Sequence, residues 1–69
     1  MAHLEVTMSF DAYHQAHCWT VWHGLKGHGA VFPGHIYGSI RARRLAFDLL
    51  SRVRESGDWE RELERTPKQ

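Results

Sequence analysis

The sequence lacks the features that mark membrane, secreted and repeat proteins. No apolar run approaches the roughly 20 residues that a membrane-spanning helix needs. The opening residues, MAHLEVTMSF, have neither a basic segment nor an apolar core, so they predict no signal peptide. Internal repeats and low-complexity segments are also missing. We therefore expect a globular protein of the cytoplasm that does not contact a membrane.

Cysteine is almost absent, which excludes another group of proteins. The single cysteine, Cys18, cannot form a disulfide within the chain and suits a reducing compartment. We expect it to be a small buried apolar residue rather than a nucleophile.

The chain is also short, with 69 residues, of which 42% are hydrophobic and 25% charged. This composition predicts one globular domain over residues 1–66, with residues 67–69 frayed. A chain of this size buries little apolar surface, so we expect a homodimer more than a monomer.

One long helix is predicted over residues 39–56, SIRARRLAFDLLSRVRES. Its apolar residues recur at helical spacing and form one continuous side. Ser39 suits the N-cap, and Gly57 suits the left-handed residue that ends a helix. Ile40 and Phe47 depart from the pattern, because they lie seven residues apart on the polar side. The apolar side consists of Ala42, Leu45, Ala46, Leu49, Leu50 and Val53.

Three strands are predicted before this helix. Residues 4–10 alternate between apolar and polar side chains, as in a half-buried strand. Residues 18–23 are rich in β-branched and aromatic residues, and the glycines of 24–29 predict a hairpin that leads into a third strand over 30–37. Pro33 predicts an edge position or a bulge in that strand. The fold class is α+β, a three-stranded antiparallel sheet followed by one long and one short helix.

The short C-terminal helix is expected to begin after Asp58, which suits an N-cap, and to end at Arg65. Trp59 and Leu63 would form its apolar side. We expect this side to cover Ile40 and Phe47, because the two apolar patches match in size.

The middle strand predicts a surface that needs a partner. Trp19 lies on one of its faces and Trp22 on the other, yet one helix covers only one face of a sheet. A second copy of the chain, another protein or a nucleic acid could shield the second face, and a two-fold dimer is the simplest of these.

Six histidines in the first half of the chain suggest a metal site as one alternative. His14, His17 and Cys18 are close in sequence, and a hairpin that turns near Lys26 would place His35 opposite His17. No C-x-x-C or H-E-x-x-H motif supports this, and His14 and His17 would point to opposite faces of a strand. Histidines that are solvated or satisfied in the core are the simpler interpretation. We predict no cofactor.

Catalysis is not expected. Cys18 with His17 or His35 and Asp11 could form a nucleophile, base and acid on paper, but no sequence context supports the set. So short a chain also has little room for an enclosed pocket.

Nucleic-acid binding is a second alternative, carried by Lys26, Arg41, Arg43 and Arg44. Three strands followed by a helix is similar to the topology of integrase arm-binding domains, an analogy of fold alone. The net charge is only +1, residues 55–68 carry five acids against three bases, and the predicted strands carry almost no lysine or arginine. We expect Glu60, Glu62 and Glu64 to pair with the arginines of the long helix.

The function that we expect is non-catalytic binding of another protein. Arginine and tryptophan are enriched at the residues that contribute most to protein interfaces. In size and style the chain is similar to small phage and mobile-element inhibitors of host complexes, such as anti-CRISPR proteins, although no motif is shared. The expected contact residues are Trp19, Trp22, Ile40, Arg43, Arg44, Phe47 and Arg54.

Overall fold

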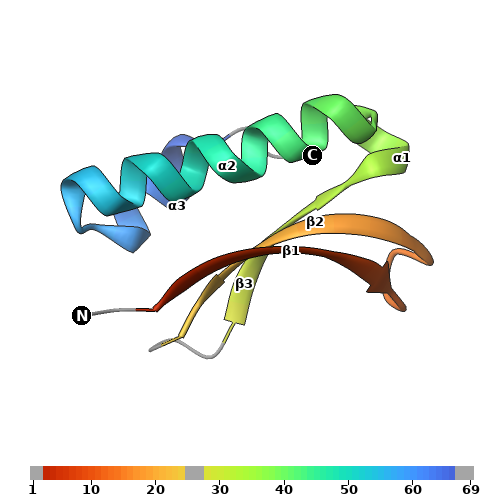
Figure 1. Ribbon diagram of the computed structural model, residues 1–69, viewed down its shortest axis with the longest axis horizontal. Helices are drawn as coiled ribbons and strands as arrows, with labels where there is room; N and C mark the ends of the chain where they lie inside the picture. Colours follow the sequence, from red (N-terminus) through yellow and green to blue (C-terminus); the bar gives the residue numbers. More distant parts are fainter. Residues whose placement is uncertain (1–2, 25–27, 67–69) are drawn as a thin grey trace.

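The computed structural model describes residues 3–24 and 28–66 and confirms the predicted α+β fold (Figure 1). Three strands precede the helices: β1 (Leu4–Asp11), β2 (Ala16–His23) and β3 (His28–Pro33). They are followed by α1 (Gly34–Tyr37), α2 (Ser39–Ser56) and α3 (Trp59–Arg65). The expected fraying of 67–69 and the predicted hairpin tip at 25–27 lie outside the described residues. No helix in the described part of the chain combines the length and apolarity needed to cross a membrane.

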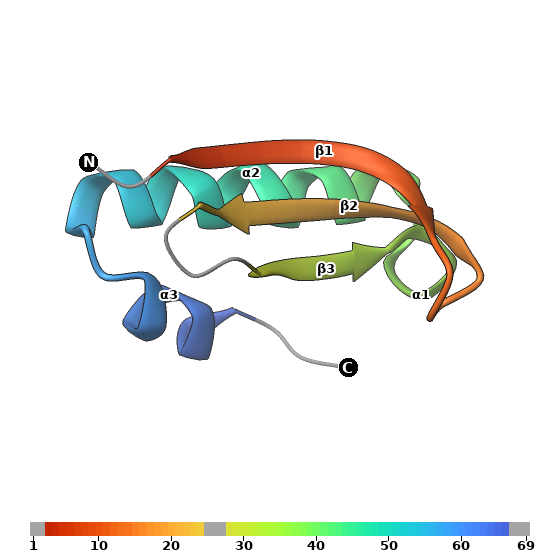
Figure 2. The ribbon, with the colours of Figure 1, turned by 90° about the horizontal axis from the view of Figure 1, so that it is seen from below.

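The strands form one antiparallel sheet in the order β1-β2-β3, so β1 and β3 are its edges (Figure 2). Val6 pairs with Val21 and Val21 with Ala30. Because side chains alternate along a strand, Val6, Trp19, Val21 and Phe32 share one face of the sheet. Pro33 belongs to β3, an edge strand, so the predicted edge position is confirmed.

Helix α2 covers this face and forms the core with it. Leu49 and Val21 are completely buried, and Leu4, Val6 and Trp19 pack against the same cluster. The apolar side predicted for the helix is the side that faces the sheet. The fully or nearly buried members are Val21, Phe32, Ala42, Ala46, Leu49, Leu50, Val53 and Trp59.

The end of the third strand and the start of the long helix differ from the prediction. The third strand stops at Pro33 instead of Tyr37, and Gly34–Tyr37 forms the single turn α1, which reverses the chain onto the sheet. Gly38 occupies the N-cap position of α2, with φ of 84°, so Ser39 is already helical and makes no capping hydrogen bond. At the other end, Gly57 is left-handed (φ 71°), which confirms the predicted stop.

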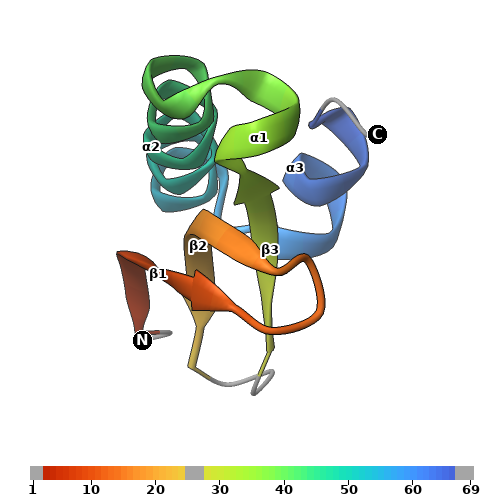
Figure 3. The ribbon, with the colours of Figure 1, turned by 90° about the vertical axis from the view of Figure 1, so that its right-hand side faces the viewer.

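The position of α3 corrects another prediction. Asp58 caps it as predicted, because its Oδ1 accepts a hydrogen bond from the Arg61 backbone N–H at 3.1 Å. However, α3 lies alongside β3 and not over the outer side of α2 (Figure 3). Trp59 is buried against His23, with ring centroids 5.0 Å apart. The interaction with His23 holds α3 at this edge, so Ile40 and Phe47 are left uncovered.

The second face of the sheet is mostly polar. Trp22 lies there and is 41% exposed, and its Nε1–H donates to Thr7 Oγ1 at 2.8 Å. Cys18 and Thr20 on the same face are buried. The expectation of two apolar faces was therefore wrong, because only Trp22 exposes a large apolar side chain here. This face alone gives no reason to require a second copy of the chain.

Candidate functional site

A stack of three side chains joins the sheet to the outer side of α2. The Arg43 guanidinium carbon lies 5.0 Å from the Phe47 ring centroid and 5.7 Å from the Trp19 ring centroid. The two rings are 6.2 Å apart and tilted. These distances are those of cation–π and aromatic contacts, so the stack fixes the position of Arg43 on the surface.

Open depressions lie on both sides of this stack. One, of about 400 Å³, is lined by residues of β1, β2 and α1, including Met8, His17 and His35. The other, of about 440 Å³, lies along α2 and is lined by Ile40, Arg44 and four further residues of the helix. We call the whole region the hairpin–helix surface and define it as Met8, Phe10, His17, Trp19, Ile40, Arg43, Arg44 and Phe47.

Large apolar side chains are exposed on the hairpin–helix surface. Ile40 is 78% exposed, Phe10 55%, Met8 52% and Phe47 38%. Met8 and Phe10 belong to the apolar side predicted for the first strand, but β1 and β2 curve away from α2 towards their shared turn (Figure 1). The helix therefore buries only the first half of that side, at Leu4 and Val6.

The arginines of this region are not neutralised by acidic side chains. Between the described residues, Arg52 lies near Asp48 and Glu62, and Arg65 lies near Glu62. Arg41, Arg43, Arg44 and Arg54 take part in none of these ion pairs. The expected pairing of the C-terminal glutamates with the arginines of the long helix is confirmed at one point, because Glu62 Oε1 lies 3.8 Å from Arg52 Nε. Among the described residues this pairing does not extend to Arg41, Arg43 and Arg44 in the first two turns of α2.

The structure brings together five of the seven predicted contact residues. Trp19, Ile40, Arg43, Arg44 and Phe47 lie on the hairpin–helix surface, and Met8 and Phe10 are additions that the curvature of the hairpin exposes.

The other residues predicted for partner or nucleic-acid binding lie elsewhere. Arg54 is exposed near the end of α2, seven residues beyond Phe47, and Trp22 lies on the opposite face of the sheet. Arg41 is exposed near the start of α2. Lys26 lies outside the described residues.

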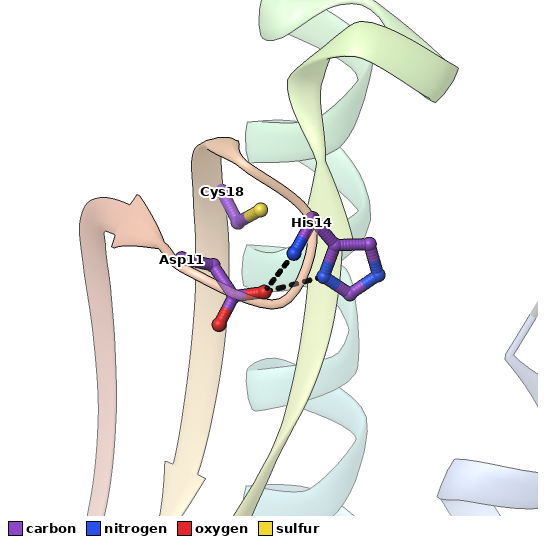
Figure 4. A group of neighbouring side chains, drawn as sticks. All are labelled: Asp11, His14 and Cys18. Atoms are coloured by element: carbon purple, nitrogen blue, oxygen red, sulfur yellow. Dashed lines mark hydrogen bonds and ion pairs between the residues drawn. The ribbon is translucent and has the colours of Figure 1, made fainter.

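A second cluster lies at the turn between β1 and β2 (Figure 4). The Asp11 Oδ2 atom accepts hydrogen bonds from the His14 backbone N–H at 3.0 Å and from His14 Nδ1 at 2.5 Å. The buried Cys18 side chain completes the cluster, and one ligand atom from each residue lies within 4.8 Å of the others. Gln15, the last residue of this turn before β2, is left-handed, with a φ of 53°.

Only part of the predicted histidine set is present in this cluster. His14 and Cys18 are members, and the ring of His35 lies 6.3 Å from that of His14. His17 points to the helix-facing side of the sheet, where its ring lies 5.7 Å from Phe10. Asp11 was not among the predicted ligands, although it had been considered as an acid beside Cys18.

The arrangement does not order Cys18, His14 and Asp11 as nucleophile, base and acid. Nδ1 of His14 faces Asp11, and Nε2 points away from Cys18 (Figure 4). Burial raises the pKa of the Cys18 thiol, and the negative charge of Asp11 raises it further. Both effects oppose formation of the thiolate that a nucleophile requires.

The Asp11–His14 contact makes stability depend on pH. The hydrogen bonds from His14 hold the pKa of Asp11 below its ordinary value of 3.8. A lowered carboxyl pKa adds stability above the unfolded pKa, and this stability is lost as the pH falls through the folded value. Asp11→Asn is therefore expected to lower the melting temperature near neutral pH, and the difference from the wild type should disappear in acid.

Asp58→Asn is the matched control, because asparagine also caps helices and should change the melting temperature little at any pH. A melting-temperature deficit of D11N that stays constant from neutral to acidic pH would show that the carboxylate charge plays no part.

Comparison with family models, with curated proteins and with solved structures finds no match to this chain.

Proposed function

We propose that the chain is a non-catalytic module that binds another protein through the hairpin–helix surface. The observation that supports this proposal is the exposure of Ile40, Phe47, Met8 and Phe10 beside arginines that have no acidic partner among the described residues. Isolated exposed apolar residues are common, but a contiguous group of them around a fixed arginine and a tryptophan has the composition of an interface centre.

The charge of the surface defines the chemistry of the partner. Arg43 and Arg44 lie among apolar side chains, so the complementary segment carries carboxylates next to apolar residues. Association with such a segment buries Ile40 and Phe47 and gives both arginines charged hydrogen-bond acceptors. Inhibition of a host complex by a phage or mobile-element protein in the cytoplasm is the biological role that we infer from the small size.

Nucleic-acid binding is the second candidate function. Arg41, Arg43 and Arg44 are all exposed in the first two turns of α2, and phosphates would satisfy them. Ile40 and Phe47 favour the protein partner. A phosphate makes no favourable contact with the exposed aliphatic side chain that lies among these arginines.

The test is a photo-crosslinking amino acid placed at Ile40, compared with the same amino acid at exposed Glu64 of α3. A protein partner should be captured from position 40 and not from position 64, and nuclease treatment should leave the product unchanged. Capture of nucleic acid would support the second candidate, and capture of the chain itself would identify a homodimer. Equal capture from both positions would contradict the proposed surface.

Variants of the surface then measure the binding of the captured partner. Ile40→Ser and Arg43→Glu are each expected to weaken binding by about tenfold or more, as at interface hot spots. Ile40 is too exposed to contribute to the core, so the melting temperature of I40S should remain that of the wild type. Isothermal titration calorimetry measures the affinity of each variant.

Arg61→Glu on α3 makes the same charge change as Arg43→Glu and should bind normally. Trp22→Ala tests the opposite face of the sheet and should also bind normally. The affinity should fall only moderately with salt, because apolar contacts contribute much of the interface, whereas binding to phosphates would weaken steeply. Normal binding by I40S together with loss of binding by W22A would move the interface to the other face.

A further inference from the structure

We propose that Asp11, His14 and Cys18 form a binding site for a divalent transition-metal ion of the zinc type at the turn between β1 and β2. The three residues offer a carboxylate oxygen, an imidazole nitrogen and a sulfur, and these atoms lie within 4.8 Å of one another (Figure 4). This donor set suits zinc, whose protein ligands are thiolates, imidazoles and carboxylates. Calcium and magnesium prefer oxygen donors alone, so they do not fit.

The fold places the three donors side by side before any ion arrives. Asp11 ends β1, and Cys18 lies two residues into β2 on the same face of the sheet, because Ser9 is paired with Cys18 and Asp11 with Ala16. His14 is held beside Asp11 by the hydrogen bonds of its backbone N–H and its Nδ1 to Asp11 Oδ2. The donor atoms of a tetrahedral zinc site lie roughly 3.3–3.8 Å apart, so only small side-chain rotations are needed to reach that spacing.

Electrostatics favours a cation at this position. Without one, Cys18 Sγ donates to the Ala16 carbonyl oxygen at 3.4 Å, and the Asp11 carboxylate accepts hydrogen bonds from His14. A divalent ion would bind His14 Nδ1 in the tautomer that carries the imidazole proton on Nε2, and it would replace the proton of the thiol. Sulfur, nitrogen and carboxylate oxygen then bind the ion directly, and the thiol proton is released to solvent.

His35 is the residue in the described part of the chain that is best placed to add a fourth ligand. It lies in α1, two residues after Pro33, the residue that pairs with Cys18 in the sheet. Its ring lies 6.3 Å from that of His14, and its side chain is exposed. Three ligands from the hairpin and one from α1 would fasten the β1–β2 turn to the end of β3. A water molecule in the fourth position would leave the three-residue site intact.

Cobalt(II) is the probe, because it replaces zinc in such sites and its bond to a thiolate absorbs light. Titration of the reduced, folded protein with Co²⁺ in the absence of oxygen should produce a thiolate-to-metal charge-transfer band, with release of protons as the band appears. Cys18→Ser should abolish the band. His14→Asn and Asp11→Asn should each weaken Co²⁺ binding by at least about tenfold, since even the loss of an outer partner of a metal ligand has such an effect.

His17→Asn is the matched control, because His17 neighbours Cys18 in sequence but lies on the opposite face of the sheet. Its Co²⁺ affinity should equal that of the wild type. His35→Asn decides the fourth ligand: weaker binding assigns it to His35, and unchanged binding supports the three-residue site with a water ligand. Circular dichroism establishes that each variant is folded before its titration is interpreted.

Three outcomes would overturn the proposal. They are a wild-type titration without a charge-transfer band, a band that persists in the Cys18→Ser variant, and equal loss of affinity in H17N and H14N. The melting temperature gives an independent measurement, because an ion that binds only the folded chain must raise it. Zn²⁺ should therefore stabilise the wild type and H17N but not H14N, and equal stabilisation of all three would also contradict the site.

Discussion

Leu49→Ala is expected to lower the free energy of unfolding by about 2–5 kcal/mol, the range found for buried leucines. Leu49 is completely buried between α2 and the sheet, where it is one of the largest side chains with no exposure. A chain of 69 residues has a total stability of roughly 3–10 kcal/mol, so this one change removes a large part of it. Urea denaturation followed by circular dichroism measures the loss.

Leu45→Ala is the matched control for this prediction. Leu45 lies one turn earlier on the same helix, but it is only half-buried at the margin of the core. Its removal leaves a smaller cavity because solvent can fill part of the space, so the free-energy loss should be clearly smaller. Equal losses for the two variants would mean that α2 is not seated on the sheet as described.

Arg52→Ala is expected to cost about 1–3 kcal/mol, because it removes one of the two arginines that lie beside a buried carboxylate. Glu62 of α3 is buried, and its Oε1 lies 3.8 Å from Arg52 Nε and 3.6 Å from Nη1 of the largely exposed Arg65. Arg52 also donates from Nη2 to Thr66 Oγ1 at 2.9 Å, so the variant loses a second link between α2 and α3. Hydrogen exchange should increase first at the backbone amides of α3.

A double-mutant cycle separates the charge effect from packing. Glu62→Gln removes the buried charge, so R52A combined with E62Q should be more stable than R52A alone. Arg61→Ala changes an exposed arginine of α3 and should alter stability by no more than about 0.5 kcal/mol. Additive effects of R52A and E62Q would show that the two side chains do not interact.

The order and type of the main elements could be predicted from the sequence because their signals are local. Alternation defined β1, helical spacing defined α2, and Gly57 and Asp58 marked the end of one helix and the start of the next. The turn α1 was missed because residues 34–37 are too few to show a helical period. A strand and one helical turn are equally compatible with such a short apolar stretch.

The position of α3 could not be predicted, because it depends on which of two apolar surfaces Trp59 packs against. Matching patch size favoured Phe47 and Ile40, but the contact with His23 at the end of the central strand is the one that forms. Gly57 is the single residue between Ser56 and Asp58, and its left-handed conformation turns α3 towards β3. The direction of that turn is a property of backbone geometry, which residue spacing does not reveal.

The residues that the long helix contributes to the candidate site could be predicted, whereas those of the hairpin could not. Ile40, Arg43, Arg44 and Phe47 share one side of α2 by spacing alone, so the sequence identifies them together. The contributions of Met8 and Phe10 depend on the curvature of the hairpin. Likewise, the Asp11, His14 and Cys18 cluster depends on the turn that ends in left-handed Gln15, a conformation that glutamine rarely adopts.

The order of the elements along the chain has a consequence for biosynthesis. All three strands precede the helix that covers them, so Val21 and Phe32 are translated before Leu49. A chain that ends before α2 has nothing to cover the apolar face of the sheet, and its two edge strands are open to pairing with other chains. Premature termination before α2 should therefore favour aggregation or chaperone capture of the released fragment.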